Sequence, residues 1–445
     1  MDPRVADDAV RLCQSLIRLD TTNPPGREQP AAELLAGWLA ASGLEPQVLA
    51  GAPGRANVVA RLGGSGELPP LLLTAHLDVV EADPAAWSRP PFSGDIADGF
   101  LWGRGAVDMK NMAAMSASVV GALARAGARP RRDIIFAGVA DEEAGSDEGA
   151  SWLVAHHPDL VRAEFALGEV GGFTMYLGGL TLYPVQVAEK GYAWIRARVR
   201  GAPGHGSMPR ADSAVVRLAA AIARLGSSHL PAHRTRAFEE FIAVAAGRAP
   251  APLRPLLRRL GSPRVAPALL RLLPDKSLAR AMAALLANTA SPTVLRAGAK
   301  TNVIPGVAEC EIDGRTLPGQ TTEDLLRELR AVLGDDVELE VMKEAPPIVT
   351  DPFRSPAWDA IVSVLAQREP DAVVAPYLIP GFTDAKAFAR LGTRWYGFSP
   401  VKLPKGLRFA ELYHGNDERI PVDGLRWGTE VLADVVAEIA QCARL

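Results

Sequence analysis

Cysteine is scarce in this sequence, and the three residues present lie far apart. Cys13, Cys310 and Cys442 form no CxxC pair, which argues against both a disulfide framework and a cysteine-based zinc site. Scattered thiols of this kind are typical of proteins from a reducing compartment. We therefore expect a cytoplasmic protein.

Long apolar runs and an excess of one charge sign are also missing. No stretch approaches the ~20 uninterrupted apolar residues of a membrane-spanning helix, and the acidic start lacks the apolar segment of a signal peptide. The 48 Lys and Arg residues nearly balance 51 Asp and Glu residues, for a formal net charge of −3. We therefore expect neither a membrane nor a nucleic acid as a partner.

The composition that remains is ordinary for a globular protein, but 445 residues are too many for one ordinary domain. Up to about residue 189, helical stripes alternate with short apolar strands, which favours a mostly parallel sheet covered by helices on both faces. From Tyr192 the pattern changes to half-exposed strands and amphipathic helices. We predict an α/β main domain over residues 1–189 and 347–445, with a smaller α+β domain inserted over 190–346.

The apolar run over residues 71–80 organises the chain, because it reads as a buried strand that ends in a His-x-Asp pair. Residues i and i+2 of a strand share a face, so His76 and Asp78 can work together at its carboxyl end. Open α/β sheets place their sites at that end. Imidazole is the commonest metal ligand, and a nearby carboxylate often fixes its orientation. A buried His–Asp pair is about as often purely structural, so further residues must decide.

Carboxylates recur at the ends of other predicted elements. Glu142 and Glu143 follow the predicted strand 132–140, Glu169 follows the short strand 164–168, and Asp108 precedes a long helix of small residues. Carboxylates at the ends of neighbouring parallel strands converge on one edge of the sheet. A second histidine, His414, lies in an acid-rich segment. The other histidines outside glycine-rich or acid-rich motifs are interpreted as surface residues: His156, His157, His229 and His233.

Two histidines and several carboxylates suit two divalent ions that share one bridging carboxylate, since Zn²⁺ accepts His nitrogen and Asp or Glu oxygen. The ions of a two-metal site lie ~3.5–4 Å apart, close enough to hold a water between them and polarise a carbonyl. The adjacent Glu142 and Glu143 fit a division of labour, in which one binds metal and the other takes a proton from the attacking water.

These motifs resemble those of the di-zinc hydrolase family that includes aminoacylases, glutamate carboxypeptidases, dipeptidases, acetylornithine deacetylases and succinyl-diaminopimelate desuccinylases. The resemblance covers nearly the whole chain, and five motifs carry it in order: AHLDVV at 75–80, GRGAVDMK at 103–110, DEE at 141–143, GEVGG at 168–172 and HGNDE at 414–418. Each motif alone is weak, but five in the same order are highly specific. The resemblance implies a zinc-peptidase-like catalytic domain with an inserted lid domain.

The resemblance also implies a role for each residue. Asp108 would bridge two zinc ions, with Co²⁺ or Mn²⁺ as substitutes, while His76 and Glu169 complete one shell and Glu143 and His414 the other. Asp78 would orient His76. Glu142 would be the general base that later hands its proton to the leaving amine. The alternative for Glu142 is an exposed acid in a charged loop.

Further motifs in and near the insert match the same family: GAPGHGSMP at 201–209, TNVIPG at 301–306, DGRTLPG at 313–319 and GFTDA at 381–385. By resemblance, His205 would hydrogen-bond the developing oxyanion and, in dimeric members, reach the partner's site. Arg315 would clamp a substrate carboxylate, with Asn302 adding an amide contact, although Arg315 in a surface salt bridge is the alternative. Gly381 would belong to a backbone loop that lines the site.

The sequence thus predicts a metallopeptidase or amidohydrolase that cleaves an amide bond next to a free carboxylate, in the manner of a dipeptidase, carboxypeptidase or aminoacylase. The substrate would be a small peptide or an N-acyl amino acid. One alternative is a catalytically silent metal- or peptide-binding protein on the same fold. Another is a serine hydrolase, although no Gly-x-Ser-x-Gly motif is present.

One departure from the compact family members is the length of the insert. Residues 229–290 extend it, and their role is open at this point. The extra segment either covers the dimerisation edge of the lid or adds to it, so a homodimer through the lid domain and a monomer both remain alternatives. Residue types alone do not select the side chain or acyl group of the substrate.

Overall fold

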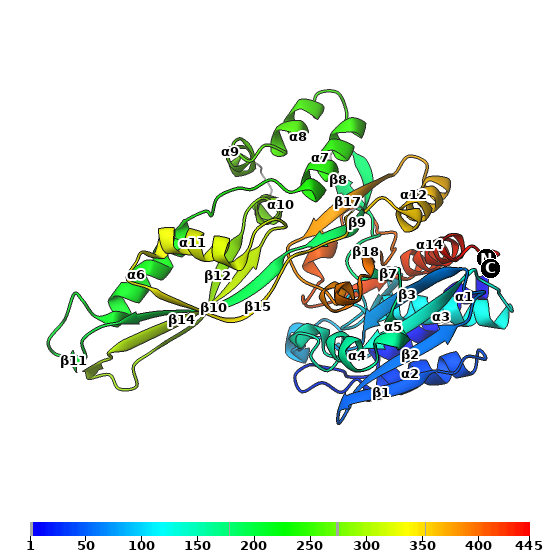
Figure 1. The fold of residues 1–445 in the computed structure, drawn as a ribbon, viewed down its shortest axis with the longest axis horizontal. Helices are drawn as coiled ribbons and strands as arrows, with labels where there is room; N and C mark the ends of the chain where they lie inside the picture. Colours follow the sequence, from blue (N-terminus) through cyan, green and yellow to red (C-terminus); the bar gives the residue numbers. More distant parts are fainter. Residues whose placement is uncertain (1–2, 178, 273–275, 352) are drawn as a thin grey trace. The chain divides into compact units, whose positions relative to one another are not determined.

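The computed structural model describes residues 3–177, 179–272, 276–351 and 353–445. The chain divides into two compact units (Figure 1). Unit 1 consists of Met1–Val187, Thr350–Tyr377 and Thr383–Leu445, and unit 2 of Ala188–Val349 and Leu378–Phe382. No helix within the described ranges is long and apolar enough to cross a bilayer.

A large mixed sheet forms the core of unit 1, with the strand order β1-β2-β6-β3-β7-β18-β9. Its central strands β6, β3, β7 and β18 are parallel, and antiparallel pairing begins on either side of them. The prediction of a mostly parallel sheet is therefore confirmed, with antiparallel flanks that the sequence pattern did not show. The strands are β1 (Gln47–Ala52), β2 (Arg55–Leu62), β3 (Leu68–His76), β6 (Arg132–Val139), β7 (Phe165–Gly168), β8 (Met175–Leu177), β9 (Leu180–Glu189), β17 (Val373–Ile379) and β18 (Arg394–Gly397).

Helix α3 (Lys110–Arg125) is buried over almost its whole length, because Ala, Ser and Gly residues let it pack closely against β3 and two other helices, α1 and α14. It begins two residues after Asp108, so its packing helps to fix the place of that carboxylate. The remaining helices of unit 1 are α1 (Pro3–Ile17), α2 (Gln29–Ala40), α4 (Ala150–His156), α5 (Pro158–Val161), α12 (Pro356–Arg368), α13 (Ala385–Phe388) and α14 (Val422–Ala440). A small sheet joins β4 (Ile96–Ala97), β5 (Phe100–Trp102) and β19 (Arg419–Pro421).

Unit 2 is built on an antiparallel sheet of order β12-β14-β10-β15 (Figure 1). Apolar residues alternate along β10, and their side chains pack against α6 and α11 on one face of the sheet. The strands are β10 (Gly191–Arg200), β11 (Gly204–His205), β12 (Thr289–Ala297), β13 (Val303–Ile304), β14 (Val307–Thr316), β15 (Glu338–Ala345) and β16 (Ile348–Val349). The helices are α6 (Ala214–Ser227), α7 (Arg236–Arg248), α8 (Arg254–Leu260), α9 (Ala266–Arg271), α10 (Lys276–Ala284) and α11 (Thr322–Leu333).

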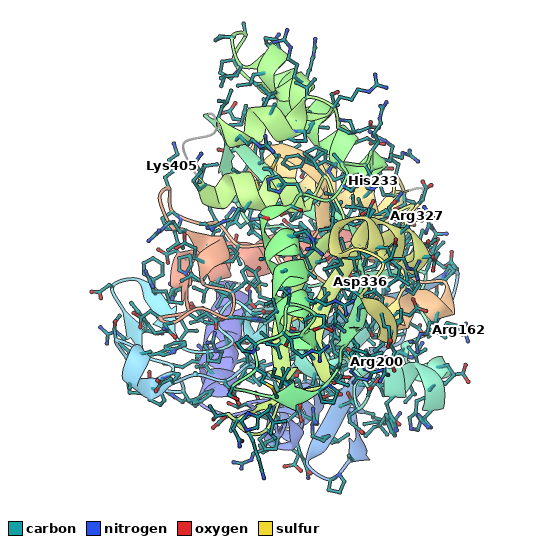
Figure 2. The ribbon with its side chains drawn as sticks, turned by 90° about the vertical axis from the view of Figure 1, so that its left-hand side faces the viewer. Arg162, Arg200, His233, Arg327, Asp336 and Lys405 are labelled. Atoms are coloured by element: carbon teal, nitrogen blue, oxygen red, sulfur yellow. The ribbon has the colours of Figure 1, made fainter. Side chains whose placement is uncertain are left out.

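His233 differs from its predicted place on the surface. It is half-buried, and its Nε2 lies 2.6 Å from a carboxylate oxygen of Glu328 on α11. Figure 2 labels His233 and, near it in that view, Arg327, the neighbour of Glu328 on α11. The other oxygen of Glu328 accepts a hydrogen bond of 3.0 Å from Asn288. The interpretation of His233 as an ordinary surface residue was wrong, because it ties the start of α7 to α11.

Candidate metal centre

His76 is the last residue of β3, and its ring is fully buried. Its Nδ1 lies 3.0 Å from the backbone oxygen of Asp78, with the Asp78 carboxylate farther away at 3.6 Å. This contact turns Nε2 toward two acids, Asp108 at 3.1 Å and Glu169 at 3.9 Å. The backbone of Asp78 is thus the nearer group that orients the imidazole.

The carboxylate of Asp78 instead holds the turn after β6. It accepts hydrogen bonds from the backbone N–H groups of Glu142 and Glu143, each at 3.1 Å, and from the Asn23 side chain at 2.9 Å. Burial by itself would raise the pKa of Asp78. The interactions with His76 and the hydrogen bonds from Asn23 and the Glu143 backbone outweigh this effect and lower the pKa. Asp78 therefore connects the end of β3 to the pair of glutamates.

Asp108 stands between the two histidines. One of its oxygens, Oδ1, faces Nε2 of His76, and the other, Oδ2, lies 3.2 Å from Nε2 of His414. Nε2 of His414 is also 3.1 Å from Glu143. A carboxylate whose two oxygens face two different ligand groups has the arrangement required of a bridging ligand.

Glu418 holds the loop that carries Asp108. Its carboxylate accepts hydrogen bonds from the backbone N–H groups of Val107 at 2.6 Å and Asp108 at 3.1 Å. Arg104 donates to the same carboxylate at 2.8 Å, and both side chains are buried. Burial raises the pKa of Glu418 to about 7, against the opposing effect of Arg104. In the HGNDE motif, the sequence indicated His414 as a candidate ligand but gave no sign of this role for Glu418.

The ligand atoms form two groups that share Asp108. In the first, atoms of His76, Asp108 and Glu169 lie within 4.8 Å of one another, and in the second, so do atoms of Asp108, Glu143 and His414. Within the described residues, Oε1 of Glu143 and Oε1 of Glu169 are buried and accept no hydrogen bond. Histidine nitrogens with unsatisfied carboxylate oxygens form a donor set that suits divalent ions such as Zn²⁺. The residues present therefore fit two ions.

The electrostatics of the cluster favour a cation as well. Burial raises the pKa of Glu169 well above its usual range, and the nearby Asp108 and Asp384 add to the rise. At His414 the hydrogen bonds to Asp108 and Glu143 raise the pKa to about 10. Buried like charges are costly unless a positive partner compensates them. A bound cation would therefore stabilise the ionised form of these acids, in place of protons on the two histidines.

Glu142 lies at the same edge of the sheet, in the turn that follows β6, and is buried. Burial raises its pKa well above the usual range, and the charge of Glu169 raises it further. The alternative of an exposed acid in a charged loop is therefore wrong. Asp384 also faces this region: its carboxylate accepts a hydrogen bond of 2.6 Å from Ser146, and its charge acts on both Glu142 and Glu169. The sequence stretch 381–385 pointed to this loop without singling out Asp384.

The remaining predicted site residues belong to unit 2. His205 is exposed and pairs with Val303 in the ribbon of β11 and β13, so the two motifs around His205 and Asn302 do come together. Asn302 itself is exposed, and its backbone oxygen accepts a hydrogen bond from Gly206 at 2.8 Å. Gly381, also in unit 2, has open space where a side chain would project.

Only some of the guanidinium donors of Arg315 have hydrogen-bond acceptors among the described residues. Its Nε and Nη2 donate to Asp313 at 2.8 and 3.0 Å, and its guanidinium lies over the ring of Phe382 at 5.1 Å. The third nitrogen, Nη1, is buried with no hydrogen-bond partner among the described residues. The ion pair with Asp313 matches the salt-bridge alternative, while the remaining donor stays available to a further acceptor.

Comparison with known proteins places these motifs in a wider group. The sequence model of peptidase family M20/M25/M40 matches residues 72–438. The N-fatty-acyl-amino acid synthase/hydrolase PM20D1 of Xenopus tropicalis is 31% identical over 372 residues, which are 82% of this chain and 71% of that protein. Aminoacylase-1 of Sus scrofa is 26% identical over 445 residues, covering 98% of this chain and 96% of that protein.

Solved structures share the fold. The M20 family metallo-carboxypeptidase Sso-CP2 from Sulfolobus solfataricus superposes with a TM-score of 0.73 at 17% identity, covering 98% of this chain and 99% of that one. Human carnosine dipeptidase 1 gives a TM-score of 0.66, also at 17% identity, with 98% and 97% covered. These likenesses confirm the predicted α/β domain with an inserted α+β domain.

Proposed function

This chain belongs to peptidase family M20/M25/M40, and from that premise we propose that it hydrolyses an amide or peptide bond next to a free carboxylate with the help of two divalent metal ions. The observation that carries the proposal is the position of Asp108, whose two oxygens face two separate ligand groups. Only a two-ion site makes use of that arrangement together with the unsatisfied oxygens of Glu143 and Glu169.

His76 and Glu169 would hold one ion, Glu143 and His414 the other, and Asp108 would contact both. When bound, such ions supply Lewis-acid polarisation of the scissile carbonyl and lower the pKa of a nearby water. Zinc is the proposed metal because the ligands are imidazole and carboxylate, with cobalt and manganese as substitutes.

Glu142 is the proposed general base. It is buried beside the metal ligands but does not itself belong to either ligand group. Its carboxylate takes a proton from the attacking water and later gives it to the leaving nitrogen. The hydrogen bonds from the Glu142 and Glu143 backbones to Asp78 hold the two glutamates in place, so that one faces the ions and the other stays free to move a proton.

The similarity to known proteins and the free donor of Arg315 support the proposed substrate class. The similar proteins include an N-fatty-acyl-amino acid synthase/hydrolase, an aminoacylase and a metallo-carboxypeptidase. We extend that class to this chain. The buried Nη1 of Arg315 is a donor suited to a carboxylate, so Arg315 is the proposed clamp, Asn302 and Gly381 the proposed neighbours, and His205 the proposed oxyanion donor.

The test measures metal content and hydrolysis on one preparation. The panel contains dipeptides, short-chain N-acyl amino acids and long-chain N-acyl amino acids, each with its methyl ester as a matched control that lacks the free carboxylate. We expect about two metals per chain, hydrolysis that a chelator abolishes, and at least roughly a tenfold preference for the free acid over its ester.

The other outcomes separate the alternatives. Two metals without hydrolysis of any panel member would favour a silent binding protein. Cleavage that persists in chelator would contradict the metal-dependent mechanism, and equal rates for acid and ester would remove the carboxylate clamp. Size-exclusion chromatography of the same preparation tests the associated proposal of a homodimer through unit 2.

A further inference from the structure

The long insert of unit 2 lines a cavity of about 600 Å³ that is open to solvent, a size typical of small-molecule sites. Its walls come from the end of α6, from α9 and α10, and from the segment that leads into β12. The backbone N–H of His233 donates to the oxygen of Leu286 at 2.7 Å, and Lys190 donates to the oxygen of Ala287 at 2.7 Å, which fixes the last of these walls. All lining residues lie within unit 2.

Helix α10 presents one face to the cavity, because the residues that line it recur at positions i, i+3, i+4, i+7 and i+8. They are Lys276, Ala279, Arg280, Ala283 and Ala284. The basic residues occupy the first turns, and the small alanines that follow leave the space unfilled. Leu225, Leu230 and Leu270 face the same space from the other walls. The cavity is therefore apolar in its body and basic at one end.

Among the described residues that line that end, the charge is of one sign. Arg271 and Arg280 are exposed, and neither forms an ion pair with a described residue. Lys276 donates to the backbone oxygen of Arg271 at 3.1 Å, so the end of α9 lies beside the start of α10, and Arg280 follows one turn along α10. Of the described residues that line the cavity, none is acidic. The sequence from Arg248 to Arg280 holds eight basic residues and one acidic residue, so this bias is strong in a chain with a net charge of −3.

We propose that this cavity binds an amphiphile with a single acyl chain and an anionic headgroup, the chain lying along the alanine face of α10 and the headgroup between Arg271 and Arg280. Burial of a chain contributes about 0.8 kcal/mol per methylene, and two guanidinium groups suit a carboxylate. A nucleotide fits less well, because the described lining contains no Phe, Tyr or Trp on which a base would stack. This site is separate from the proposed function, whose metal ligands all lie in unit 1.

The test is isothermal titration of the metal-loaded full chain with monomeric dodecanoate. Two matched probes serve as controls: acetate, which lacks the alkyl chain, and dodecyltrimethylammonium, which keeps the chain but carries a positive charge. We expect saturable binding of one dodecanoate and no binding of either control probe. Arg271→Glu/Arg280→Glu should weaken dodecanoate binding at least about tenfold, and Ala279→Trp, which fills the cavity without changing charge, should do the same.

The control is Arg258→Glu/Arg259→Glu, which makes the same charge change on exposed residues of α8 outside the cavity. It should leave the dissociation constant within about twofold. An equal loss of dodecanoate affinity in both double variants would mean that dodecanoate is attracted to the basic surface in general and does not bind in the cavity. Binding that no cavity variant weakens would place dodecanoate elsewhere, for example at the metal centre. Absence of dodecanoate binding would also overturn the proposal. In that case, sedimentation of the protein with phosphatidylglycerol vesicles would show that the basic insert binds a membrane surface.

Thermal melts and metal content of each variant show whether it has folded. A variant that fails either check is replaced by its milder form, Arg271→Gln/Arg280→Gln or Ala279→Leu. The loss of binding is then judged against Arg258→Gln/Arg259→Gln. With correctly folded variants, every combination of results either supports the cavity or excludes it.

Discussion

Glu142 and Glu143 are neighbours in the sequence, but the structure gives them different surroundings. Glu143 faces His414 at 3.1 Å, whereas Glu142 lies outside both ligand groups. Glu142→Gln should therefore retain about two metals and lose roughly 10²–10⁴-fold in kcat, the usual contribution of a general base. Glu143→Gln should lose metal as well as activity. Metal analysis and steady-state kinetics on both variants distinguish the roles, with the exposed Glu81→Gln as a control that changes neither.

A Glu142→Gln protein with wild-type turnover would contradict the assignment of Glu142 as the general base. A protein that loses its metal on this substitution would instead make Glu142 a ligand. The contrast with Glu143 matters because both side chains lose one charge, so a general electrostatic effect would act on both alike.

Arg55 compensates two buried acids behind the metal centre. Its guanidinium donates to Glu28 at 2.8 Å and to Asp141 at 2.6 Å, and Glu28 is fully buried. Arg55→Met would leave both carboxylates without their cation, so we expect a loss of about 3–5 kcal/mol in the free energy of unfolding. The matched control is Arg61→Met on the same strand, which breaks a half-exposed pair with Asp133 and should cost at most about 1 kcal/mol. Urea unfolding measures both, and equal costs would contradict the argument.

At the scale of single elements, the strands that carry the ligands were the ones the sequence predicted best. The apolar run before His76 and the strand before Glu142 both form, because central parallel strands are buried on two faces and leave a continuous apolar signal. Other strands of the same sheet were not predicted, among them β1, β8, β17 and β18. Strand β1 is mostly exposed and β8 and β18 are very short, so their local patterns are weak. Strand β17 is mostly buried, and its pairing with β9, a strand far away in the sequence, decides its conformation.

The parts of the site that escaped the sequence depend on contacts between distant residues. Glu418 binds the backbone beside Asp108 across 310 positions of the chain, and no local pattern reports such a contact. Asp384 likewise meets Ser146 across 238 positions. The ligand residues could be recognised because their types and order are characteristic, whereas the groups that hold them are ordinary acids whose role arises only on folding.

Helix α11 begins with a capping box. The Thr321 hydroxyl accepts from the Asp324 backbone at 3.2 Å, and the Asp324 carboxylate accepts from the Thr321 backbone at 2.9 Å. Thr321→Ala should lower the free energy of unfolding of unit 2 by about 1 kcal/mol. Gln320→Ala, one residue earlier and outside the box, is the control. A thermal melt with no shift for Thr321→Ala would show that tertiary packing alone holds the start of α11.

The junction of β9 and β10 contains Lys190, which is fully buried. Burial lowers the pKa of Lys190 to about 7, and the nearby Arg315 lowers it further, while Glu328 opposes the shift. The unfolded chain keeps a lysine pKa of about 10.4, so between about pH 7 and pH 10 the unfolded state binds more protons than the folded state. Stability from this group therefore rises with pH across that window, by about 1.4 kcal/mol for each pH unit.

Lys190→Met keeps most of the aliphatic stem and removes the titrating group. We expect the free energy of unfolding of the wild type to rise relative to Lys190→Met as the pH increases from about 7 to 10. Urea unfolding at several pH values measures this difference, and taking the difference cancels the other groups that titrate in the same range. A difference that stays constant with pH would mean that Lys190 keeps its ordinary pKa in the folded chain.

At the scale of the whole molecule, the two units have separate cores, and the candidate metal ligands belong to only one of them. The sheet of unit 2 packs its own apolar cluster against α6 and α11, whereas the metal ligands all belong to unit 1. Ligands that bind only the folded state stabilise it by RT ln(1 + [L]/Kd), about 4 kcal/mol when the free metal is 1,000 times its Kd. Removing the metals also leaves several buried acids without a compensating charge, so the loss should fall on unit 1.

Calorimetry with and without chelator checks this expectation. We expect the transition of unit 1 to move to lower temperature by several degrees on metal removal, while the transition of unit 2 stays in place. Thr321→Ala identifies the unit 2 transition, because its effect should fall on that transition alone. If chelator moves both transitions together, the units unfold as one cooperative block and the stability of the insert depends on the metal centre. If chelator moves neither, the acids around Asp108 are stable without metal, and the electrostatic argument for a two-ion site loses its support.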